Sequence, residues 1–175
     1  MQYFVTSTDL QAIFKNCKKV KYADFDQYSD IYQLLPNRMD FVFLLTESEE
    51  NSRHWTLLIK DDNLIEYYDS YATSPNNILD YIPSFKNKQL CKNYKEDLGK
   101  MIKSIKPTDK FIYNKTKFQN EQEGINTCGR WVIARLSLFL SDDLNLKEFT
   151  KLMKTKAKKL KMSLDPFITF LVTLN

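Results

Sequence analysis

Three residue types that together support nucleophilic catalysis are spread along the chain: a thiol, an imidazole and a carboxylate. The imidazole belongs to His54, which is the only histidine in the sequence. Asp69 follows a pair of tyrosines, and Cys128 stands directly before Gly129. In such a set the thiolate attacks a carbonyl carbon, the imidazole moves the proton and the carboxylate orients the imidazole. Any Cys–His chemistry in this chain therefore has to use His54.

The segments next to His54 and Asp69 predict a β-hairpin. Residues 54–59 and 64–68 are rich in apolar, aromatic and β-branched side chains, and the polar residues 61–63 between them indicate a turn. Antiparallel pairing would bring the start of the first strand beside the end of the second. We therefore expect Asp69 to accept the imidazole N–H of His54, to select its tautomer and to favour its cation.

Cys128 precedes a segment whose apolar residues recur with helical spacing. A helix N-terminus carries about half a positive charge, and together with a histidinium it would favour the thiolate. Gly129 would leave space beside the sulfur for a substrate carbonyl. The backbone N–H of Cys128 and the side-chain amide of Gln119 or Gln122 are the candidate oxyanion donors.

Each of these residues also has an ordinary structural interpretation. A cysteine before an apolar helix is often a packed thiol, and a histidine beside a tryptophan is often structural. An aspartate after a strand is often a turn residue. The catalytic interpretation depends on finding all of them, in this order and each at the boundary of a predicted element.

The remaining segments predict an α+β layout. Capping residues 6–9 indicate a short first helix, and the continuous apolar run within residues 40–46 indicates a buried strand. The other predicted elements are a polar loop over 47–53, a helix over 94–105, a strand from 111, and helices over 145–162 and 165–174.

Composition indicates one folded domain over residues 1–175, with 43% hydrophobic residues and only 3 Gly and 5 Pro. The 3 cysteines and the apparent lack of a leader favour reduced thiols in a soluble, reducing compartment. No apolar run is long enough to span a membrane. With a single histidine and dispersed cysteines we expect no metal and no cofactor.

The net charge of +4 is unevenly distributed, because lysines cluster between residues 147 and 161. Such a cluster can hold DNA or an acidic partner through electrostatics that do not depend on sequence. The other interpretation is the solvated face of a helix. The candidate DNA-binding residues are Lys151, Lys154, Lys158, Lys159 and Lys161.

These motifs resemble those of the CE clan of cysteine peptidases, which holds adenain, the adenovirus maturation protease, and the proteases that process modifiers such as SUMO. The clan has His-Trp at a strand start, then a Tyr-(Tyr/Phe)-Asp-Ser acid site, a glutamine, and Cys-Gly before the central helix. The resemblance covers about residues 9–140, and its matching segments are His54-Trp55, Tyr67-Tyr68-Asp69-Ser70 and Cys128-Gly129.

The resemblance implies a papain-like-inverted fold, with a central mixed β-sheet flanked by helices and the nucleophile at the N-terminus of a central helix. It implies Cys128 as nucleophile, His54 as base and acid, and Asp69 as its orienter. It also implies cleavage after small residues, at Gly-Gly or Gly-X-Gly/Ala sites, in a narrow channel whose wall includes Trp55. Core packing is the other interpretation of Trp55.

The clan patterns leave the glutamine open. Counting back from the cysteine as in the SUMO proteases gives Gln122, whereas the spacing after Tyr113-Asn114 resembles the viral pattern and favours Gln119.

Within the clan, the compact chain looks like the adenain-like proteases of adenoviruses, virophages, polintons and large DNA viruses. The implied activity is the processing of capsid or other virion precursor proteins. We expect a monomer that acts in the host cytoplasm or nucleus, or packaged in the virion, with no membrane partner. A protease for SUMO- or ubiquitin-like modifiers is the second interpretation, and a non-catalytic nucleic-acid-binding module is the third.

Overall fold

The structure is a computed structural model that describes residues 4–49, 52–75, 98–120, 122 and 124–174. Its centre is a mixed five-stranded sheet in the order β1-β2-β3-β4-β5. The central strands pair antiparallel, while β1 joins β2 and β5 joins β4 in parallel. The strands are β1 Lys18–Lys21, β2 Phe41–Glu49, β3 Ser52–Asp61, β4 Leu64–Tyr68 and β5 Lys110–Tyr113.

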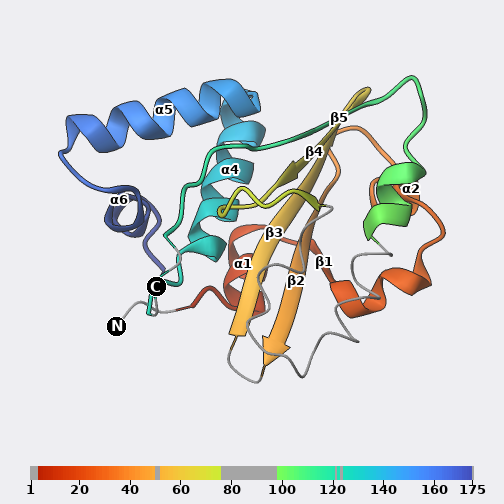
Figure 1. The fold of residues 1–175 in the computed structure, drawn as a ribbon, viewed down its shortest axis with the longest axis horizontal. Coiled ribbons are helices and arrows are strands. Elements are labelled where there is room, and N and C mark those ends of the chain that lie inside the picture. The colour runs from red at the N-terminus through yellow and green to blue at the C-terminus, as the bar shows by residue number, and fades with distance from the viewer. Residues whose placement is uncertain (1–3, 50–51, 76–97, 121, 123, 175) are drawn as a thin grey trace.

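Helices cover both faces of this sheet. Figure 1 shows α4, α5 and α6 on one side and α2 on the other. Residues 98–103 are also helical. The remaining helices are α1 Ser7–Ile13, the 3-10 helix η1 Tyr22–Gln27, α2 Ile31–Leu34, α4 Cys128–Asp142, α5 Leu146–Lys159 and α6 Leu164–Leu171. The expected α+β class, with a mixed sheet flanked by helices, is confirmed.

The apolar run of β2 explains why the sheet is buried on both faces. Successive side chains of a strand point to opposite faces. Phe43 and Leu45 therefore join the cluster under α1 and α4, while Val42 and Leu44 join a second cluster with η1 and α2. All four are at most 9% exposed.

The predicted first helix is confirmed, and its cap has the expected residues. The Thr6 hydroxyl accepts from the Asp9 N–H at 3.1 Å, and the Asp9 carboxylate accepts from the Thr6 N–H at 2.6 Å. This reciprocal capping box satisfies two backbone donors that the helix leaves unpaired.

The predicted polar loop over 47–53 is wrong, because β2 continues to Glu49 and β3 begins at Ser52. Charged residues can extend the strands here because Glu47 and Arg53 attract each other across the pair. Glu47 lies opposite Arg53 and forms ion pairs with Arg53 at 3.3 Å and Lys21 at 2.9 Å.

The elements β1, η1 and α2 were not expected from the sequence. Strand β1 has only four residues, three of them lysines, so its pattern carries little strand signal. The strand forms because it pairs with β2, which is a tertiary contact that no local sequence pattern encodes.

The predicted strands over 64–68 and from 111 are confirmed. The two C-terminal helices are each shorter than predicted, ending at Lys159 and Leu171. Of the helix predicted over 94–105, residues 94–97 lie outside the described residues.

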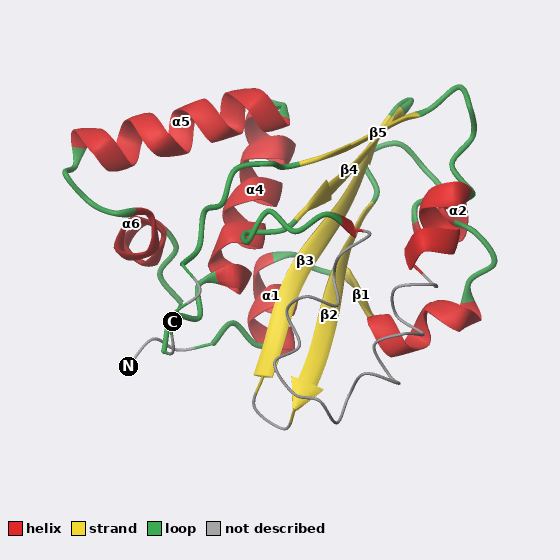
Figure 2. Ribbon diagram, in the orientation of Figure 1, coloured by secondary structure: helices red, strands yellow, loops and turns green. Residues whose placement is uncertain are grey.

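Helix α4 forms the centre of the larger hydrophobic cluster, with Trp131 and Leu136 completely buried. After β5, the chain continues through Asn114 as a loop and returns along α4 to its N-terminus (Figure 2). Among the described residues, none of the helices has the length and apolar character that a membrane crossing requires.

Candidate active site

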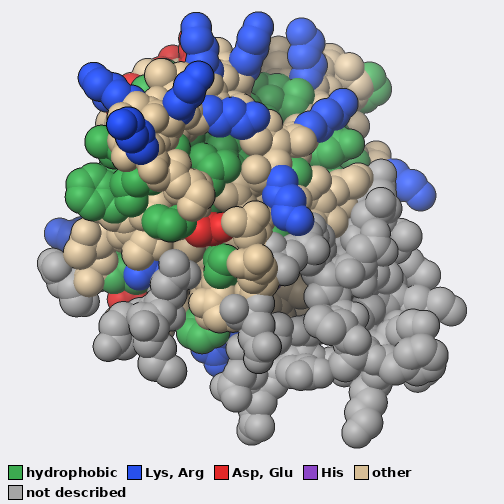
Figure 3. All heavy atoms as spheres, turned by 60° about the vertical axis from the view of Figure 1, so that its left-hand side comes forward, with side chains coloured by type: hydrophobic (Ala, Val, Ile, Leu, Met, Phe, Trp, Pro, Cys, Tyr) green, Lys and Arg blue, Asp and Glu red, His purple; other side chains and the backbone are tan. Residues whose placement is uncertain are grey.

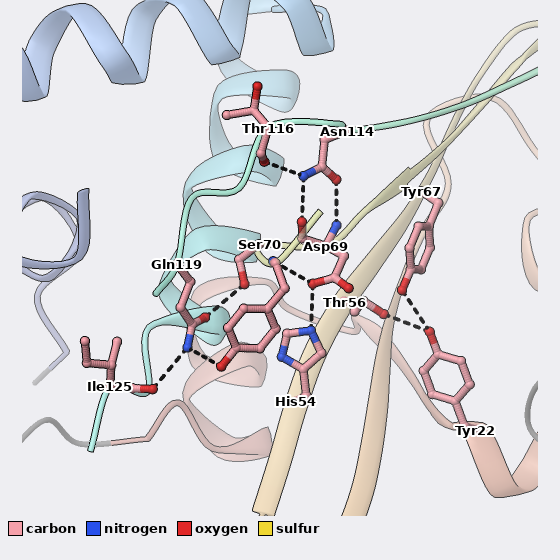
Figure 4. Close-up of polar contacts among 11 residues, drawn as sticks. Tyr22, His54, Thr56, Tyr67, Asp69, Ser70, Asn114, Thr116, Gln119 and Ile125 are labelled. Carbon is pink, nitrogen blue, oxygen red and sulfur yellow. Dashed lines mark hydrogen bonds and ion pairs between the residues drawn. The ribbon is translucent and has the colours of Figure 1, made fainter. Parts of the chain in front are cut away.

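The hairpin of β3 and β4 brings His54 and Asp69 into direct contact. The strands pair Leu57 with Tyr68, so Asp69 follows the end of β4 beside the first half of β3. The Nε2 atom of His54 lies 2.8 Å from Oδ1 of Asp69 (Figure 4). The side chain of Asp69 is only 2% exposed and that of His54 is 17% exposed. The expected contact between imidazole and carboxylate is present.

Asp69 is held by its own turn and by Asn114. Its Oδ1 atom also accepts from the Tyr71 N–H at 2.9 Å. The Asn114 side chain accepts from the Asp69 N–H at 2.8 Å and donates to the Asp69 carbonyl at 2.6 Å. Asn114 also donates to the Thr116 carbonyl at 3.1 Å, so one buried amide connects the acid to the loop after β5.

The imidazole of His54 has different partners at its two nitrogens. Because Nε2 faces Asp69, Nδ1 is the atom that remains for the hydrogen bond between the His54 and Cys128 side chains. The ring of Tyr71 stacks on the imidazole, with centroids 4.8 Å apart and planes 28° apart. The imidazole is therefore oriented by contacts at its edge and on its face.

The electrostatics favour an ion pair between His54 and Cys128. Burial opposes a charged imidazole, but Asp69 and Cys128 outweigh it and raise the pKa of His54 to about 10. Burial likewise disfavours the thiolate, yet the pKa of Cys128 is lowered by His54 and by the backbone N–H groups of Trp55 and Gly129. These opposite shifts favour the imidazolium–thiolate pair over the neutral pair.

Cys128 is the first residue of α4, as expected. Its predecessor Thr127 is the N-cap residue, but the Thr127 side chain makes no capping hydrogen bond. The partial positive charge of the first turn is therefore not offset by that side chain. This arrangement places the sulfur where a helix stabilises a developing negative charge.

The expected role of Gly129 is corrected by the structure. The space that a side chain would occupy is filled by Val5, because a Cβ at position 129 would overlap Val5 Cβ and lie 2.5 Å from Val5 Cγ2. Glycine is required here for the close approach of the N-terminal segment, not for leaving room beside the sulfur.

Trp55 is packed in the core, with 3% of its surface exposed. Its indole N–H donates to the Val5 carbonyl at 2.9 Å, and its ring meets Phe43 edge to face. These contacts agree with the core-packing interpretation. A place in a channel wall stays a prediction.

The two candidate glutamines have different environments. Gln119 is 1% exposed, and its Oε1 atom accepts from the Ser70 hydroxyl at 2.9 Å. Its Nε2 atom donates to the Tyr71 hydroxyl at 2.9 Å and the Ile125 carbonyl at 3.1 Å (Figure 4). Gln122 is exposed. The structure thus connects Gln119, and not Gln122, to the turn that carries Asp69.

The five candidate DNA-binding lysines are exposed, four of them on α5 and Lys161 just beyond its end. Figure 3 shows basic side chains gathered along the upper edge of the molecule, where α5 lies. The apolar face of α5 is buried through Phe149, Met153 and Ala157. The helix is therefore amphipathic and presents its lysines to solvent.

Sequence reasoning missed three groups that shape the site: the stacking ring of Tyr71, the amide of Asn114 as the clamp of Asp69, and the carboxylate of Asp165, which contacts Thr127. Only the position of Asn114, directly after a predicted strand, carried a signal. Cys91 lies outside the described residues. Within the described part of the chain, no three His, Cys, Asp or Glu side chains group as a metal site.

The fold and this geometry define an α+β protein with a cysteine, a histidine and an aspartate in contact at the start of a central helix. The chain is 31% identical over 163 residues to "Uncharacterized protein V9" of Sputnik virophage, a match that covers 93% of this chain and 89% of V9. The chain belongs to the same family as this virophage protein. No protein-family model matches it.

Two solved proteases have similar structures at low sequence identity. The ASFV pS273R protease is 16% identical with a TM-score of 0.41, over 83% of this chain and 64% of that protease. The SUMO protease Ulp1, with its catalytic cysteine oxidised to a sulfinic acid, is 18% identical with a TM-score of 0.42, over 96% of this chain and 78% of Ulp1. This chain therefore spans less than two thirds of the ASFV protease.

Proposed function

We propose that this protein is a cysteine endopeptidase with Cys128 as nucleophile, His54 as base and acid, and Asp69 as the group that orients His54. The observation that carries the proposal is the position of His54, whose imidazole bonds to Asp69 at 2.8 Å and to the Cys128 side chain through its other nitrogen. The lowered pKa of Cys128 and the raised pKa of His54 supply the reactive ion pair.

The reaction follows from these positions. The Cys128 thiolate attacks the carbonyl carbon of the scissile amide, and the carbonyl electrons move to oxygen to form a tetrahedral oxyanion. The amide C–N bond breaks as the imidazolium of His54 gives its proton to the leaving nitrogen, which leaves a thioester. Neutral His54 then takes a proton from water, the hydroxide oxygen attacks the thioester, and the carboxylic acid product leaves as the sulfur regains its electrons.

The oxyanion needs hydrogen-bond donors at the start of α4. The backbone N–H of Cys128 is one proposed donor, and the side-chain amide of Gln119 is the second. Gln119 is favoured over Gln122 because it is buried beside the Asp69 turn. Its Nε2 atom would have to exchange its bond to Tyr71 or Ile125 for the oxyanion.

The enzymatic proposal is tested with Cys128→Ala, Cys128→Ser and His54→Ala. Each should abolish peptide cleavage and leave the circular dichroism spectrum unchanged. Cys128→Ser is the matched control, because it changes one atom and keeps the hydrogen-bonding group. A wild-type protein that cuts no candidate substrate and resists thiol alkylation at neutral pH would refute the proposal.

The substrates we propose are capsid or other virion precursor proteins, cut after small residues at Gly-Gly or Gly-X-Gly/Ala sites. Membership of a family that contains a virophage protein supports a viral role over modifier processing. The test is to incubate the protein with a capsid precursor and, separately, with SUMO and ubiquitin conjugates. Cleavage of the precursor alone agrees with the proposal, whereas cleavage of the conjugates alone would assign the protein to modifier processing.

A nucleic-acid-binding role is a second candidate, favoured by the exposed lysines of α5. Neutralising phosphates with lysines makes affinity fall steeply with salt. Retention on DNA should therefore weaken as salt is raised. Replacing Lys151, Lys154 and Lys158 by glutamine should weaken it further, and Cys128→Ala should leave it unchanged. Salt-independent retention would exclude this role.

A further inference from the structure

Asp165, in the first turn of α6, is a buried acid whose two oxygens both reach toward the loop before Cys128. It is 2% exposed. Its Oδ1 atom accepts from the Thr127 hydroxyl at 2.6 Å, and its Oδ2 atom accepts from the Asn120 backbone N–H at 3.1 Å. Hydrogen bonds to an ionised carboxylate are about twice as strong as neutral ones. A strong interaction thus joins α6 to the loop.

The two donors stand at functionally different ends of the same loop. Asn120 follows Gln119, the proposed oxyanion donor, and Thr127 precedes Cys128. By holding both, one carboxylate sets the separation between the glutamine and the nucleophile. Displacements of about 1 Å in such constellations can reduce rates by about 100-fold.

The bond to Asp165 also explains why the Thr127 side chain does not cap α4. A threonine at an N-cap usually accepts a hydrogen bond from the first turn of its helix. Here the Thr127 hydroxyl is turned to Asp165, and the side chain makes no capping bond. The Gly129 N–H instead hydrogen bonds to the Cys128 sulfur.

The other end of α6 is attached to the same turn of α4. The Arg130 guanidinium donates to the carbonyl of Val172, the C-cap of α6, at 3.2 Å. Helix α6 therefore contacts the residues on both sides of Cys128-Gly129. Its position is determined by Phe167 and Ile168, which are buried in the main cluster.

We infer that Asp165 is a positioning residue of the active site. It acts through Thr127 and Asn120 to fix the distance between the nucleophile and the proposed oxyanion donor Gln119. This inference rests on the proposed function. It assigns α6 a role in the chemistry, although α6 supplies no reacting atom.

A positioning role and a simple charge effect predict opposite changes in the alkylation rate of Cys128 when Asp165 is removed. A negative charge near the Cys128 thiolate disfavours that thiolate, so removing the charge alone would speed its alkylation. If Asp165 positions the loop, removing it should slow alkylation, because the contacts that lower the pKa of Cys128 are lost.

The experiment measures alkylation of Cys128 by iodoacetamide as a function of pH. Mass spectrometry of peptides distinguishes it from alkylation of Cys17, another buried free cysteine. Asp165→Ala should slow Cys128 alkylation at neutral pH roughly 10- to 100-fold and shift its profile to higher pH. Asp165→Asn keeps an acceptor for Thr127 but not for the Asn120 N–H, so its effect should be intermediate. The rate at Cys17 should not change.

Thr127 provides a matched pair of variants. Thr127→Val removes the hydroxyl at constant shape and should also slow alkylation, whereas Thr127→Ser keeps it and should react like wild type. Combining Thr127→Val with Asp165→Ala should add little to Asp165→Ala, because both remove the same contact. If Asp165→Ala does not fold, as judged by circular dichroism, the two Thr127 variants decide the question.

Glu148 is the control acid, because it stands in the first turn of α5, as Asp165 does in α6, but is exposed and caps only its own helix. Glu148→Gln should leave Cys128 alkylation unchanged. Unchanged or faster alkylation in Asp165→Ala, or an equal loss in Glu148→Gln, would overturn the inference.

Alkylation needs no peptide substrate, so the inference can be refuted independently of the proposed function. A protein that cuts nothing, but loses Cys128 reactivity in Asp165→Ala, would refute the protease and retain the positioning role. If a peptide is cut, Asp165→Ala should lower kcat more than it raises KM.

Discussion

Glu66 and Arg135 form a bidentate ion pair that joins β4 to α4, with both nitrogen–oxygen distances at 2.7 Å. Their side chains are only 4% and 1% exposed. Arg135 also donates to the Leu144 carbonyl at 2.9 Å and lies over the ring of Phe149. Since β4 leads to Asp69 and α4 begins at Cys128, this pair connects the two elements that carry the acid and the nucleophile.

Breaking this pair from one side should destabilise the protein strongly. Arg135→Met leaves the Glu66 charge buried without its partner, which costs about 3–5 kcal/mol in the free energy of unfolding. The double variant with Glu66→Met should recover a large part of that loss, because an apolar pair leaves no buried charge. Urea unfolding of wild type, Arg135→Met, Glu66→Met and the double variant measures these differences in the free energy of unfolding. A double variant as unstable as the sum of both singles would contradict the argument.

Cys128 and Cys17 should differ sharply in their reactivity with pH. Burial raises the pKa of Cys17 and outweighs the nearby Lys19, whereas the pKa of Cys128 is lowered by His54. At neutral pH, iodoacetamide should modify Cys128 roughly tenfold faster or more. In His54→Ala this advantage should disappear and the Cys128 profile should move to higher pH. Equal rates at the two cysteines in wild type would contradict the ion pair.

The charge on His54 in its pair with Cys128 makes the free energy of unfolding depend on pH. The pKa of His54 is raised from 6.5 to about 10, so the native state binds its proton more tightly than the unfolded chain. The resulting stabilisation is complete below about pH 6.5 and is lost as the pH rises through about 10. The difference in unfolding free energy between wild type and His54→Ala should therefore shrink over that range. A constant difference would show that His54 is not charged in the native state.

The hairpin and the helix start could be predicted because each depends on a local pattern. The apolar runs on either side of Asp62 predict β3 and β4, and the helical spacing after Cys128 predicts α4. A single histidine then leaves one candidate base.

The supporting contacts could not be predicted, because they join distant positions. Asn114 meets Asp69, and Asp165 meets Thr127, across long separations in sequence. An isolated polar residue in a loop has no periodic signal that names its partner. The space beside Gly129 was misjudged for the same reason, since Val5 reaches it from the other end of the chain.

Gly129→Ala should destabilise the protein, because the new methyl group would overlap Val5. Overpacking of this kind costs about 1–3 kcal/mol. Val5→Gly removes all three Val5 atoms that the methyl group would meet, so it should relieve the strain in the double variant.

Gly99→Ala is the matched control: position 99 is helical and has no atom within 4 Å of a new Cβ. It should raise stability by up to about 1 kcal/mol. Thermal unfolding distinguishes the two glycines, and equal effects would contradict the packing argument.

Asn114→Ala should impair the site through Asp69, although Cys128, His54 and Asp69 themselves are unchanged. The substitution removes the amide that accepts from the Asp69 N–H and donates to the Asp69 carbonyl. Leaving the buried Asp69 N–H unpaired costs about 1–3 kcal/mol, whereas the Asp69 carbonyl still accepts from the Ala72 N–H at 2.9 Å. Because Asp69 then orients His54 less well, the Cys128 alkylation profile should shift to higher pH. Asn114→Asp is the informative comparison: it keeps the acceptor for the Asp69 N–H but loses the donor to the carbonyl, and it adds a negative charge. An Asn114→Ala variant that loses stability but keeps the wild-type pH profile would show that Asn114 supports the fold and not the orientation of His54.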